Sequence, residues 1–385
     1  MRSISISKWS NLHWANLILL FPSLVSLTAG IHNGLKRSRS QDYQWSGAHL
    51  FSLHYDPYLV YLLKDPGHQI LKSQVPNYLQ ELYVLLWPMG MLNEHTAAAL
   101  WLGFNLLFAV VSVLLLGHIF KLTQGKTLSL GLLLATSTPF RIAIGNGQQS
   151  LLLLMLLLLV FAAPARGGWT LGLSYFKYSF APILFFYFAC KKAYRILLLS
   201  LVLPIAGWLI FWIRVGGSPL RTALEPVLVG RIGVSPGTAD LCTLMMLVAP
   251  RWVPFSLLLA VALSALLAYA IHRREHSRSQ AVSGLAICSL FLFPHLIYDF
   301  VLLVIPAALL LSDERPKRLP SIASILSLIV LVYLMPSLGG HVAALICFWI
   351  NFTLLLVLCI SVLSPRKLSH AQPSISSIKA VRTGN

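Results

Sequence analysis

Residues 150–162 read SLLLLMLLLLVFA and contain no charged side chain. Similar apolar runs recur along the chain, many of them near the roughly 20 residues that an α-helix needs to cross a bilayer. Hydrophobic residues make up 57% of the 385 residues, whereas charged residues make up only 10%. This composition predicts an all-α, polytopic membrane protein.

The apolar runs predict about 11 or 12 transmembrane helices, with additional short interfacial or re-entrant helices. The candidate spans are residues 11–30, 97–120, 127–139, 149–164, 169–190, 194–213, 253–271, 281–294, 296–311, 319–336 and 341–363. Two shorter apolar pieces, residues 78–92 and 239–249, are predicted to lie at the interface or to form short spans. The first span is interpreted as uncleaved, rather than as a signal peptide, because many further spans follow it.

These spans form one predicted integral-membrane domain, residues 1–363. It includes a first external loop at 31–76 and another external loop at 214–238. The Ser-rich, basic tail at 364–385 is predicted to be disordered and cytoplasmic. All five cysteines lie in or beside apolar segments without metal-ligand spacing, so neither a disulfide nor a metal site is expected.

The net charge of +18 would suggest a nucleic-acid partner in a soluble protein. Here the basic residues collect in short loops, as the positive-inside rule predicts for a cytoplasmic face, so no nucleic-acid partner is expected. The clusters are Lys191, Lys192 and Arg195; Arg273, Arg274 and Arg278; and Arg315, Lys317 and Arg318. Both termini are then cytoplasmic. Short loops without retention signals favour a bacterial plasma membrane.

The segment 169–190 is predicted to be a broken pair of short helices that enters a cavity and returns. It carries Lys177 in its middle and Pro182 soon after, and an intramembrane lysine requires cover from water or protein. This interpretation also places Lys191 and Lys192 on the cytoplasmic side, with Lys177 facing an external cavity.

The same topology brings several polar motifs to the external side. They are SRSQDYQWSGAH with Asp42, HYDPY with Asp56 and Tyr58, GNGQQ with Gln148 after Arg141, SYFKYSFAP with Lys177, and FPHLIYDF with His295, Tyr298 and Asp299. Only eleven acidic residues occur in the whole chain, and three of them lie in the segment 31–76. Carboxylates kept in so apolar a chain point to a functional site.

The order of these motifs resembles the GT-C membrane glycosyltransferases that use polyprenol-phosphate sugars, and most of all glycosyltransferase family 87. The resemblance covers roughly residues 10–311 and implies a GT-C-like fold. It implies that Asp42 is the catalytic base and that the family's Gly-Gln pair, lysine and histidine correspond to Gly147 with Gln148, to Lys177 and to His295. Before DPY this chain departs from the pattern, because His54 and Tyr55 replace the usual glycine. Mannose is the sugar that the resemblance implies.

The chemistry of these residue types fits such a transfer. A carboxylate in reach of an acceptor hydroxyl takes its proton while the oxygen attacks the anomeric carbon, and one carboxylate suffices for an inverting displacement. The phosphate leaving group requires cations or donors, and Arg141, Lys177 and His295 are suitable types. No DxD pair occurs, so we expect no cofactor and no required metal. The expected partners are a polyprenyl-phosphate sugar, a glycan or glycolipid acceptor and the lipid bilayer.

Each candidate also has a purely structural interpretation. Asp42 can be a solvated loop carboxylate, and Asp56 can cap a helix. Lys177 can snorkel to the interface, while His295 and Asp299, four residues apart, can simply satisfy each other. The GNGQQ motif can be a polar turn, and Arg141 can anchor a helix end. Residues 214–238, with Arg221, Glu225 and Arg231, show no pattern that assigns a role.

Two alternative functions remain open from the sequence. One is a lipid or sugar transporter that uses Lys177 and Asp299 in its translocation path, although the inverted repeats common in transporters are not seen. The other is a noncatalytic subunit of a glycan-assembly complex, which would tolerate replacement of Asp42.

Overall fold

The computed structural model describes residues 6–36, 44–64, 75–232, 239–275, 277–312 and 341–363. Within these ranges all regular elements are helices and no strand occurs, which confirms the all-α prediction. The long helices are α1 (Ile6–Lys36), α5 (Glu94–Ile119), α11 (Tyr194–Val215), α14 (Val253–Arg274) and α18 (His341–Leu363). The shorter helices are α2 (Trp45–Ser52), α3 (Pro57–Leu63), α4 (Gln80–Gly90), α6 (Gln124–Thr136), α7 (Thr138–Gly145), α8 (Ser150–Ala162), α9 (Gly167–Ser174), α10 (Ala181–Cys190), α12 (Pro219–Ile232), α13 (Leu241–Val248), α15 (Arg278–Leu292) and α16 (Val304–Leu311). The 3-10 helices are η2 (Pro164–Arg166), η3 (Pro250–Trp252) and η4 (Ile297–Leu303).

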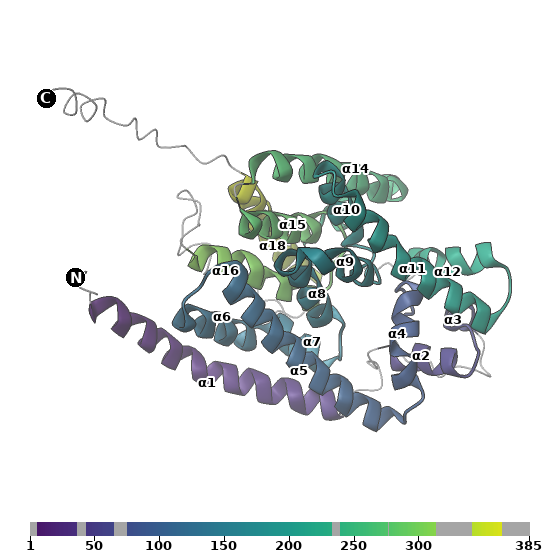
Figure 1. The fold of residues 1–385 in the computed structure, drawn as a ribbon, viewed down its shortest axis with the longest axis horizontal. Helices are drawn as coiled ribbons and strands as arrows, with labels where there is room; N and C mark the ends of the chain where they lie inside the picture. The colour runs from purple at the N-terminus through teal and green to yellow at the C-terminus, as the bar shows by residue number, and fades with distance from the viewer. Residues whose placement is uncertain are drawn as a thin grey trace, which may run out of the picture.

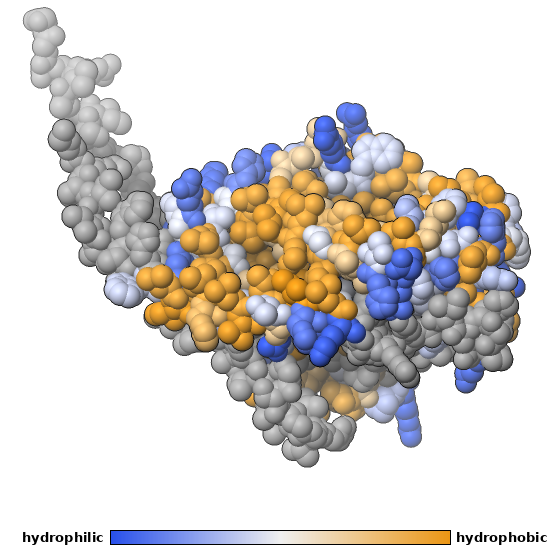
Figure 2. Space-filling view, turned by 90° about the horizontal axis from the view of Figure 1, so that it is seen from below, coloured by the Kyte–Doolittle hydropathy of each residue, from blue (hydrophilic) through white to orange (hydrophobic). Residues whose placement is uncertain are grey.

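Four helices in the described ranges are long and apolar enough to cross a membrane, and they belong to α1, α5, α11 and α14. The number rises to six if two bent pairs, α6 with α7 and α8 with η2 and α9, each count as one span. Large apolar side chains on these helices face outward, for example Trp14, Ile18 and Phe21 on one side of α1. Figure 2 shows such side chains covering a broad area of one face. The protein is therefore a multi-pass membrane protein.

Several predicted boundaries agree with the helices to within a few residues. The predicted spans 97–120, 149–164, 194–213 and 341–363 correspond to α5, α8, α11 and α18. The short pieces 78–92 and 239–249 correspond to α4 and α13. The predicted span 319–336 and the predicted tail 364–385 lie outside the described residues.

The predicted single span 127–139 is wrong in shape. The chain bends there by 63° between α6 and α7. Ser137 has an extended backbone and its hydroxyl accepts a hydrogen bond from the Phe140 backbone N–H at 3.2 Å, so it caps a new helix. Pro139 follows in the first turn of α7, where it donates no hydrogen bond and is well tolerated. The cap and the proline together restart the helix in a new direction.

The two predicted external loops are also largely helical. Residues 31–76 contain the end of α1 and the whole of α2 and α3, and residues 214–238 contain α12. Figure 1 shows α2, α3, α4 and α12 together at one end of the molecule, far from the start of α1. We call these four helices the head. Helices α2 and α3 have only eight and seven residues, so they give no run long enough to be recognised from hydropathy, whereas α4 corresponds to the predicted piece 78–92.

Arg214 fastens the head to the end of α11. Its Nε donates to the Phe51 carbonyl at 2.9 Å and its terminal nitrogen donates to the Ser52 carbonyl at 2.5 Å. These carbonyls end α2, where the helix leaves acceptors without partners, so a cation there satisfies both the hydrogen bonds and the helix dipole. The guanidinium also lies 4.0 Å from the centre of the Trp87 ring on α4. One side chain thus joins α2, α4 and α11.

Two of the three basic clusters lie at the end of the bundle away from the head, and the third, at 315–318, is outside the described residues. Lys191, just after α10, forms an ion pair with Glu275 at the end of α14, and Tyr187 donates to the same carboxylate at 2.5 Å. Arg278 lies within 3.5 Å of the Phe161 carbonyl at the end of α8. The clusters at 191–195 and 273–278 therefore lie at one end of the molecule, as their common assignment to one membrane side requires.

Small residues let the helices next to α8 approach closely. A Cβ added at Gly168 would come within 2.6 Å of the Leu199 side chain, and one at Gly172 would come within 2.6 Å of the Ser200 carbonyl. Helix α9 therefore runs along the first turns of α11 in the same direction, with backbones in contact. The axes of α8 and η2–α9 differ by 115°, so the chain turns back on itself between these two helical pieces.

Candidate functional site

Lys177 lies in the break between α9 and α10, as the sequence predicts. Residues 175–180 form turns between the end of α9 at Ser174 and the start of α10 at Ala181. The residue is only 9% exposed. Its Nζ forms an ion pair with Asp299 and lies 5.1 Å from the centre of the Tyr298 ring. The ammonium is therefore held inside the bundle, and the interpretation that it snorkels to the interface is wrong.

Asp299 is the centre of this buried cluster. It lies on η4, a 3-10 helix of seven residues, which is longer than most such helices. One carboxylate oxygen binds both the Lys177 ammonium and the Ser150 hydroxyl, while the other lies 3.1 Å from Nδ1 of His295. Asp299 is 2% exposed, so its charge is balanced by the lysine rather than by water.

His295 completes the cluster from the loop between α15 and η4. It contacts Asp299, as the spacing of four residues predicts, although it precedes η4 instead of sharing a helix with Asp299. The Phe180 ring packs on the imidazole at 4.4 Å between centroids. Among the described residues the Nε2 atom of His295 has no hydrogen-bond partner, and the side chain is 1% exposed. One ring nitrogen is thus fixed by the carboxylate and the other is available to a ligand.

A chain of hydrogen bonds connects this cluster to the head. The Tyr58 hydroxyl on α3 donates to the Tyr78 carbonyl at 2.6 Å. The next residue, Leu79, donates its backbone N–H to the Phe176 carbonyl at 3.1 Å, one residue before Lys177. The motif DPY and the motif around Lys177 therefore lie near each other, although they are more than 100 residues apart in the sequence.

Asp56 is the N-cap of α3. Its Oδ1 accepts hydrogen bonds from the backbone N–H of Tyr58 at 2.9 Å and of Leu59 at 3.2 Å. The structural interpretation of Asp56 is therefore confirmed. The carboxyl group of Glu225, on α12, interacts electrostatically with the Asp56 side chain. Burial and this neighbouring carboxylate raise the pKa of Glu225 to about 8.

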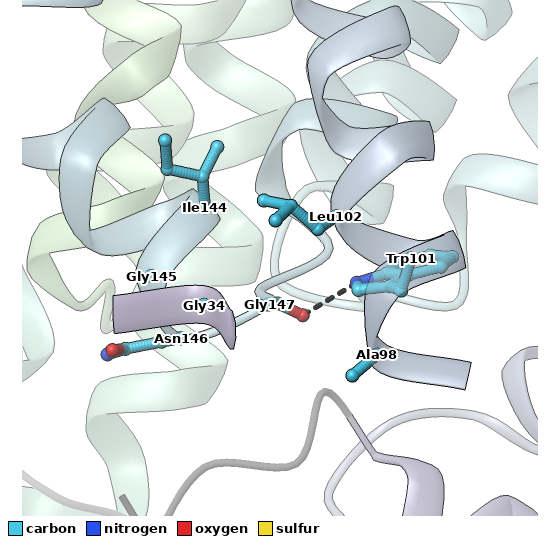
Figure 3. A pocket seen from close by; sticks show the side chains of 8 residues that line it. All are labelled: Gly34, Ala98, Trp101, Leu102, Ile144, Gly145, Asn146 and Gly147. Carbon is cyan, nitrogen blue, oxygen red and sulfur yellow. Dashed lines mark hydrogen bonds between the residues drawn. The ribbon is translucent and has the colours of Figure 1, made fainter. Parts of the chain in front are cut away.

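The GNGQQ motif forms a buried turn between α7 and α8. Gly147 has a φ of 61°, which suits glycine, and its carbonyl accepts a hydrogen bond from the Trp101 indole at 2.8 Å. Figure 3 shows Trp101 reaching this carbonyl beside a small pocket. The cavity volume of about 10 Å³ holds at most a water molecule, so the pocket is no sugar site. Gln148 is buried in the turn and its backbone N–H donates to the Ala143 carbonyl at 2.8 Å.

Two predicted site residues do not join the cluster. Arg141 is half-buried on α7, and in the described part of the chain no hydrogen bond or ion pair connects it to Lys177, His295 or Asp299. Asp42, the predicted base, lies outside the described residues. Two residues after it, Gln44 accepts a hydrogen bond from the Tyr83 hydroxyl at 2.8 Å and donates to the Val75 carbonyl at 3.1 Å.

Sequence reasoning assigned no role to three buried polar residues. Ser150 donates to Asp299, Glu225 interacts electrostatically with Asp56, and Glu81 on α4 is 4% exposed. Within the described residues neither carboxyl oxygen of Glu81 has a hydrogen-bond partner. The rarity of acids in this chain was the available signal for Glu81 and Glu225. Nothing in the sequence distinguishes Ser150 from other helix-initiating serines.

Comparison with known proteins identifies the family of this chain. The model of glycosyltransferase family 87 matches residues 82–306, which is more than half of the chain. The chain belongs to glycosyltransferase family 87. The resemblance inferred from the motifs is thereby confirmed, and membership in the family indicates glycosyltransferase activity. The match includes Gln148, Lys177, His295 and Asp299 but begins after Asp42 and Asp56. No curated protein and no solved structure matched the chain.

Proposed function

We propose that this family 87 glycosyltransferase moves a sugar, mannose or a similar hexose, from a polyprenyl-phosphate donor to an acceptor hydroxyl at the external membrane face. The acceptor is a glycan or glycolipid, and the reaction inverts the anomeric centre. The membrane is a bacterial plasma membrane with both termini cytoplasmic. The observation that supports this proposal best is the buried cluster of Lys177, Asp299 and His295 next to the head.

The cluster suits a lipid-phosphate donor. In its doubly protonated form His295 donates from Nδ1 to Asp299 and from Nε2 to a phosphate oxygen. Lys177, held by the same carboxylate, supplies a second positive charge at that place. Together the two groups supply positive charge and hydrogen-bond donors that stabilise a phosphate leaving group in a dry environment, while Asp299 and the buried Asp240, which interacts electrostatically with His295, offset part of that charge. The helices around the cluster are apolar, as a site for a polyprenyl chain requires.

Asp42 is our proposed general base. Its carboxylate takes the proton of the acceptor hydroxyl while that oxygen forms a bond to the anomeric carbon. The bond between this carbon and the phosphate oxygen breaks, and polyprenyl phosphate leaves with the electron pair. Charge is conserved without a metal: one negative charge is lost at Asp42, and the departing phosphate gains one.

The decisive experiment measures transfer of radiolabel from a panel of polyprenyl-phosphate sugars and nucleotide sugars by the full-length protein in nanodiscs. We expect the wild type to use a polyprenyl-phosphate donor and Asp42→Asn to lose about 10²- to 10⁴-fold in rate, the usual effect of removing a general base. Asp65→Asn, in the same segment, is the matched control and should retain activity.

Other outcomes separate the alternatives. Undiminished transfer by Asp42→Asn would move the base to another residue. Transfer only from nucleotide sugars would refute the proposed donor. If no donor supports transfer while label crosses vesicles, the protein is a transporter, and if neither occurs, a noncatalytic subunit is the better interpretation.

A further inference from the structure

A tight turn joins the spanning helix α11 to helix α12. Helix α11 ends at Val215, and α12 begins at Pro219 after Gly216 and Gly217, whose φ values are 76° and 87°. Glycine adopts such values without strain. The Trp212 indole N–H donates to the Gly217 carbonyl at 3.0 Å and holds the turn against the end of α11. The chain therefore changes direction where α11, which is long and apolar enough to cross a membrane, ends.

The break that carries Lys177 lies well short of this end of α11. Tyr175, in the break, places its hydroxyl 3.2 Å from the Ser200 hydroxyl. Ser200 is fifteen residues before Val215, so about 22 Å of helix separates it from the end of α11. The break is therefore beside the middle of a spanning helix rather than at its outer end.

The start of α12 is already below the end of α11. The Thr222 carbonyl accepts a hydrogen bond from the Gln80 side chain of α4 at 2.5 Å. Glu81, the next residue of α4, packs on α11 so closely that a Cβ added at Gly207 would come within 2.6 Å of the Glu81 side chain. Gly207 is eight residues, or about 12 Å, before the end of α11. Thr222 is thus held near the level of Gly207.

The far end of α12 reaches the break. Gly230 lies so close to Tyr178 that an added Cβ would come within 2.7 Å of the tyrosine oxygen. Tyr178 directly follows Lys177 in the sequence. Helix α12 therefore runs from the end of α11 back toward the level of the break, at a depth where α11 is inside the membrane.

The side of α12 that faces away from the protein is apolar. Its exposed large side chains are Leu220, Leu224, Val227 and Leu228, with exposed fractions of 70%, 48%, 61% and 45%. On a helix with 3.6 residues per turn these positions lie within an arc of about 100°. Within residues 219–230 the one exposed charged side chain is that of Arg221, and its Nε donates to Glu225 at 2.9 Å. We call the four apolar residues the α12 stripe. A helix in water presents polar residues on its outer side, so this stripe suits lipid.

Helix α13 brings the chain back to the end of the bundle. Cys242, in its first turn, donates to the Leu292 carbonyl at 3.3 Å, three residues before His295. At the other end of α13, Val248 is 67% exposed, and the chain continues through η3 to Trp252, which is 59% exposed and directly precedes α14. An exposed tryptophan at the end of a spanning helix is typical of a membrane boundary. The chain thus enters with α12 and leaves with α13.

We propose that α12 and α13 form a re-entrant hairpin, in which the α12 stripe contacts the acyl chains of the leaflet at the head end of the bundle. Residues 233–238, between the two helices, lie outside the described residues. The last turns of α11 before the hairpin are also apolar and exposed, with Ile210 at 41% and Ile213 at 69%, so lipid already covers the neighbouring helix. The inference concerns the membrane position of residues 219–248 and holds for any reaction that the protein catalyses.

The depth of spin labels in nanodiscs tests the hairpin in the full-length protein. Labels are attached to Leu220→Cys and Leu228→Cys, and their accessibility to oxygen and to a water-soluble nickel chelate is measured. Ile213→Cys and Ile205→Cys, on the exposed side of α11, are also eight residues apart and calibrate the depth. The label at 220 should read close to the one at 213, whereas the label at 228 should lie deeper by up to about 12 Å, toward the one at 205. Lys192→Cys, at the exposed basic end, gives the reading for water.

The wild type carried through the same labelling gives the background from the native cysteines, of which Cys242, Cys288 and Cys359 are buried. Nickel accessibility at 220 and 228 equal to that at 192 would place α12 in water and overturn the proposal. An equally shallow depth at both positions would lay α12 flat on the membrane surface, which also overturns it.

Two further readings would contradict lipid as the partner. Low accessibility to both reagents would mean that protein covers the stripe. Dipolar broadening that disappears on dilution with unlabelled protein would mean that a second copy does. Should Leu228→Cys fail to fold, Leu224→Cys, on the same stripe, replaces it.

Hydrogen exchange measured by mass spectrometry provides a test without labels. Val227→Ser removes an exposed apolar side chain, and serine and valine have similar helix propensities. If the stripe lies in lipid, residues 219–230 should exchange about tenfold faster in this variant, because the helix loses the burial of one such side chain. Val110→Ser, on the exposed side of α5, is the matched control and should leave the exchange of these residues unchanged. Unchanged exchange in Val227→Ser would overturn the proposal.

Discussion

The bundle and the head each contain a buried carboxylate, and they neutralise it differently. In the bundle, Asp299 is balanced by Lys177 and further bound by Ser150 and His295. In the head, Asp56 interacts with another acid, Glu225. Burial and this interaction raise the pKa of Glu225 to about 8, so Glu225 is mostly protonated at neutral pH. The first arrangement pairs an acid with a base, whereas the second places two acids near each other, so that Glu225 changes charge near pH 8.

This difference indicates different tasks. A site that stabilises a departing phosphate requires a field that is already in place before the reaction, and fixed ion pairs provide it. The head carries no such ion pair at Asp56, and α12 packs there through buried Pro226 and Val229 as well as through Thr222 and Glu225.

The largest expected effect comes from breaking the bundle pair. Lys177→Met leaves Asp299 charged and buried without its counter-ion, which typically costs about 3 to 5 kcal/mol. We expect a large loss of resistance to thermal unfolding in nanodiscs and no measurable transfer. Lys192→Met, which removes an exposed lysine at the basic end, should leave both properties close to the wild type.

The double variant Lys177→Met with Asp299→Leu separates stability from function. Because both buried charges are removed together, most of the lost stability should return, whereas transfer should stay absent. Recovery of transfer in the double variant would show that the pair serves the fold alone.

Sequence reasoning predicted some features of the Lys177–Asp299 pair and missed others. A lysine in the middle of an apolar segment has to be covered by water or protein, and this requirement predicted the break around Lys177. The prediction placed Lys177 toward an external cavity, whereas its ammonium is buried against Asp299. The motif FPHLIYDF drew attention to Asp299. Neither argument could reveal that Ser150, 149 residues earlier, donates to the same carboxylate, because contacts between distant segments leave no local pattern.

The helices likewise divide into those that the sequence predicts and those that depend on contacts between distant segments. Runs such as 341–363 were assigned correctly because hydropathy alone identifies a helix in lipid. Helix α12 was missed because polar and apolar residues occur on both of its faces: Thr222 and Glu225 are buried together with Val229, whereas Leu220, Leu224 and Val227 are exposed. The two short helices α2 and α3 were assigned to a loop for a related reason: they are stabilised by contacts with α4, α11 and Arg214 rather than by their own periodicity.

A smaller effect is expected from His295→Gln. The glutamine can still bind Asp299, and Lys177 and Ser150 also remain, so the fold should persist. Because the donor at Nε2 is lost, kcat for transfer should fall by about 10²- to 10³-fold, as when one donor to a developing oxyanion is removed. Steady-state assays with His118→Gln, at the exposed end of α5, provide the control. An unchanged kcat would remove His295 from the proposed phosphate site.

The smallest effect concerns the cap at Asp56. Asparagine caps helices as well as aspartate does, so Asp56→Asn should change the free energy of unfolding by only a few tenths of a kcal/mol, whereas Asp56→Ala should cost about 1 kcal/mol. Thermal unfolding in nanodiscs at pH 6.5, where Glu225 is protonated, measures both changes in stability.

At pH 9 the ranking of wild type and Asp56→Asn by stability should reverse. The asparagine variant should become more stable than the wild type, because Glu225 then ionises beside a neutral amide instead of a carboxylate. Asp299→Asn offers the contrasting case, since a neutral amide there leaves the Lys177 ammonium buried without a counter-ion and should cost several kcal/mol at either pH. If Asp56→Asn lowered the stability as much as Asp299→Asn, both carboxylates would be required as charged groups in the fold. The distinction between the ion-paired Asp299 in the bundle and the helix-capping Asp56 in the head would then be wrong.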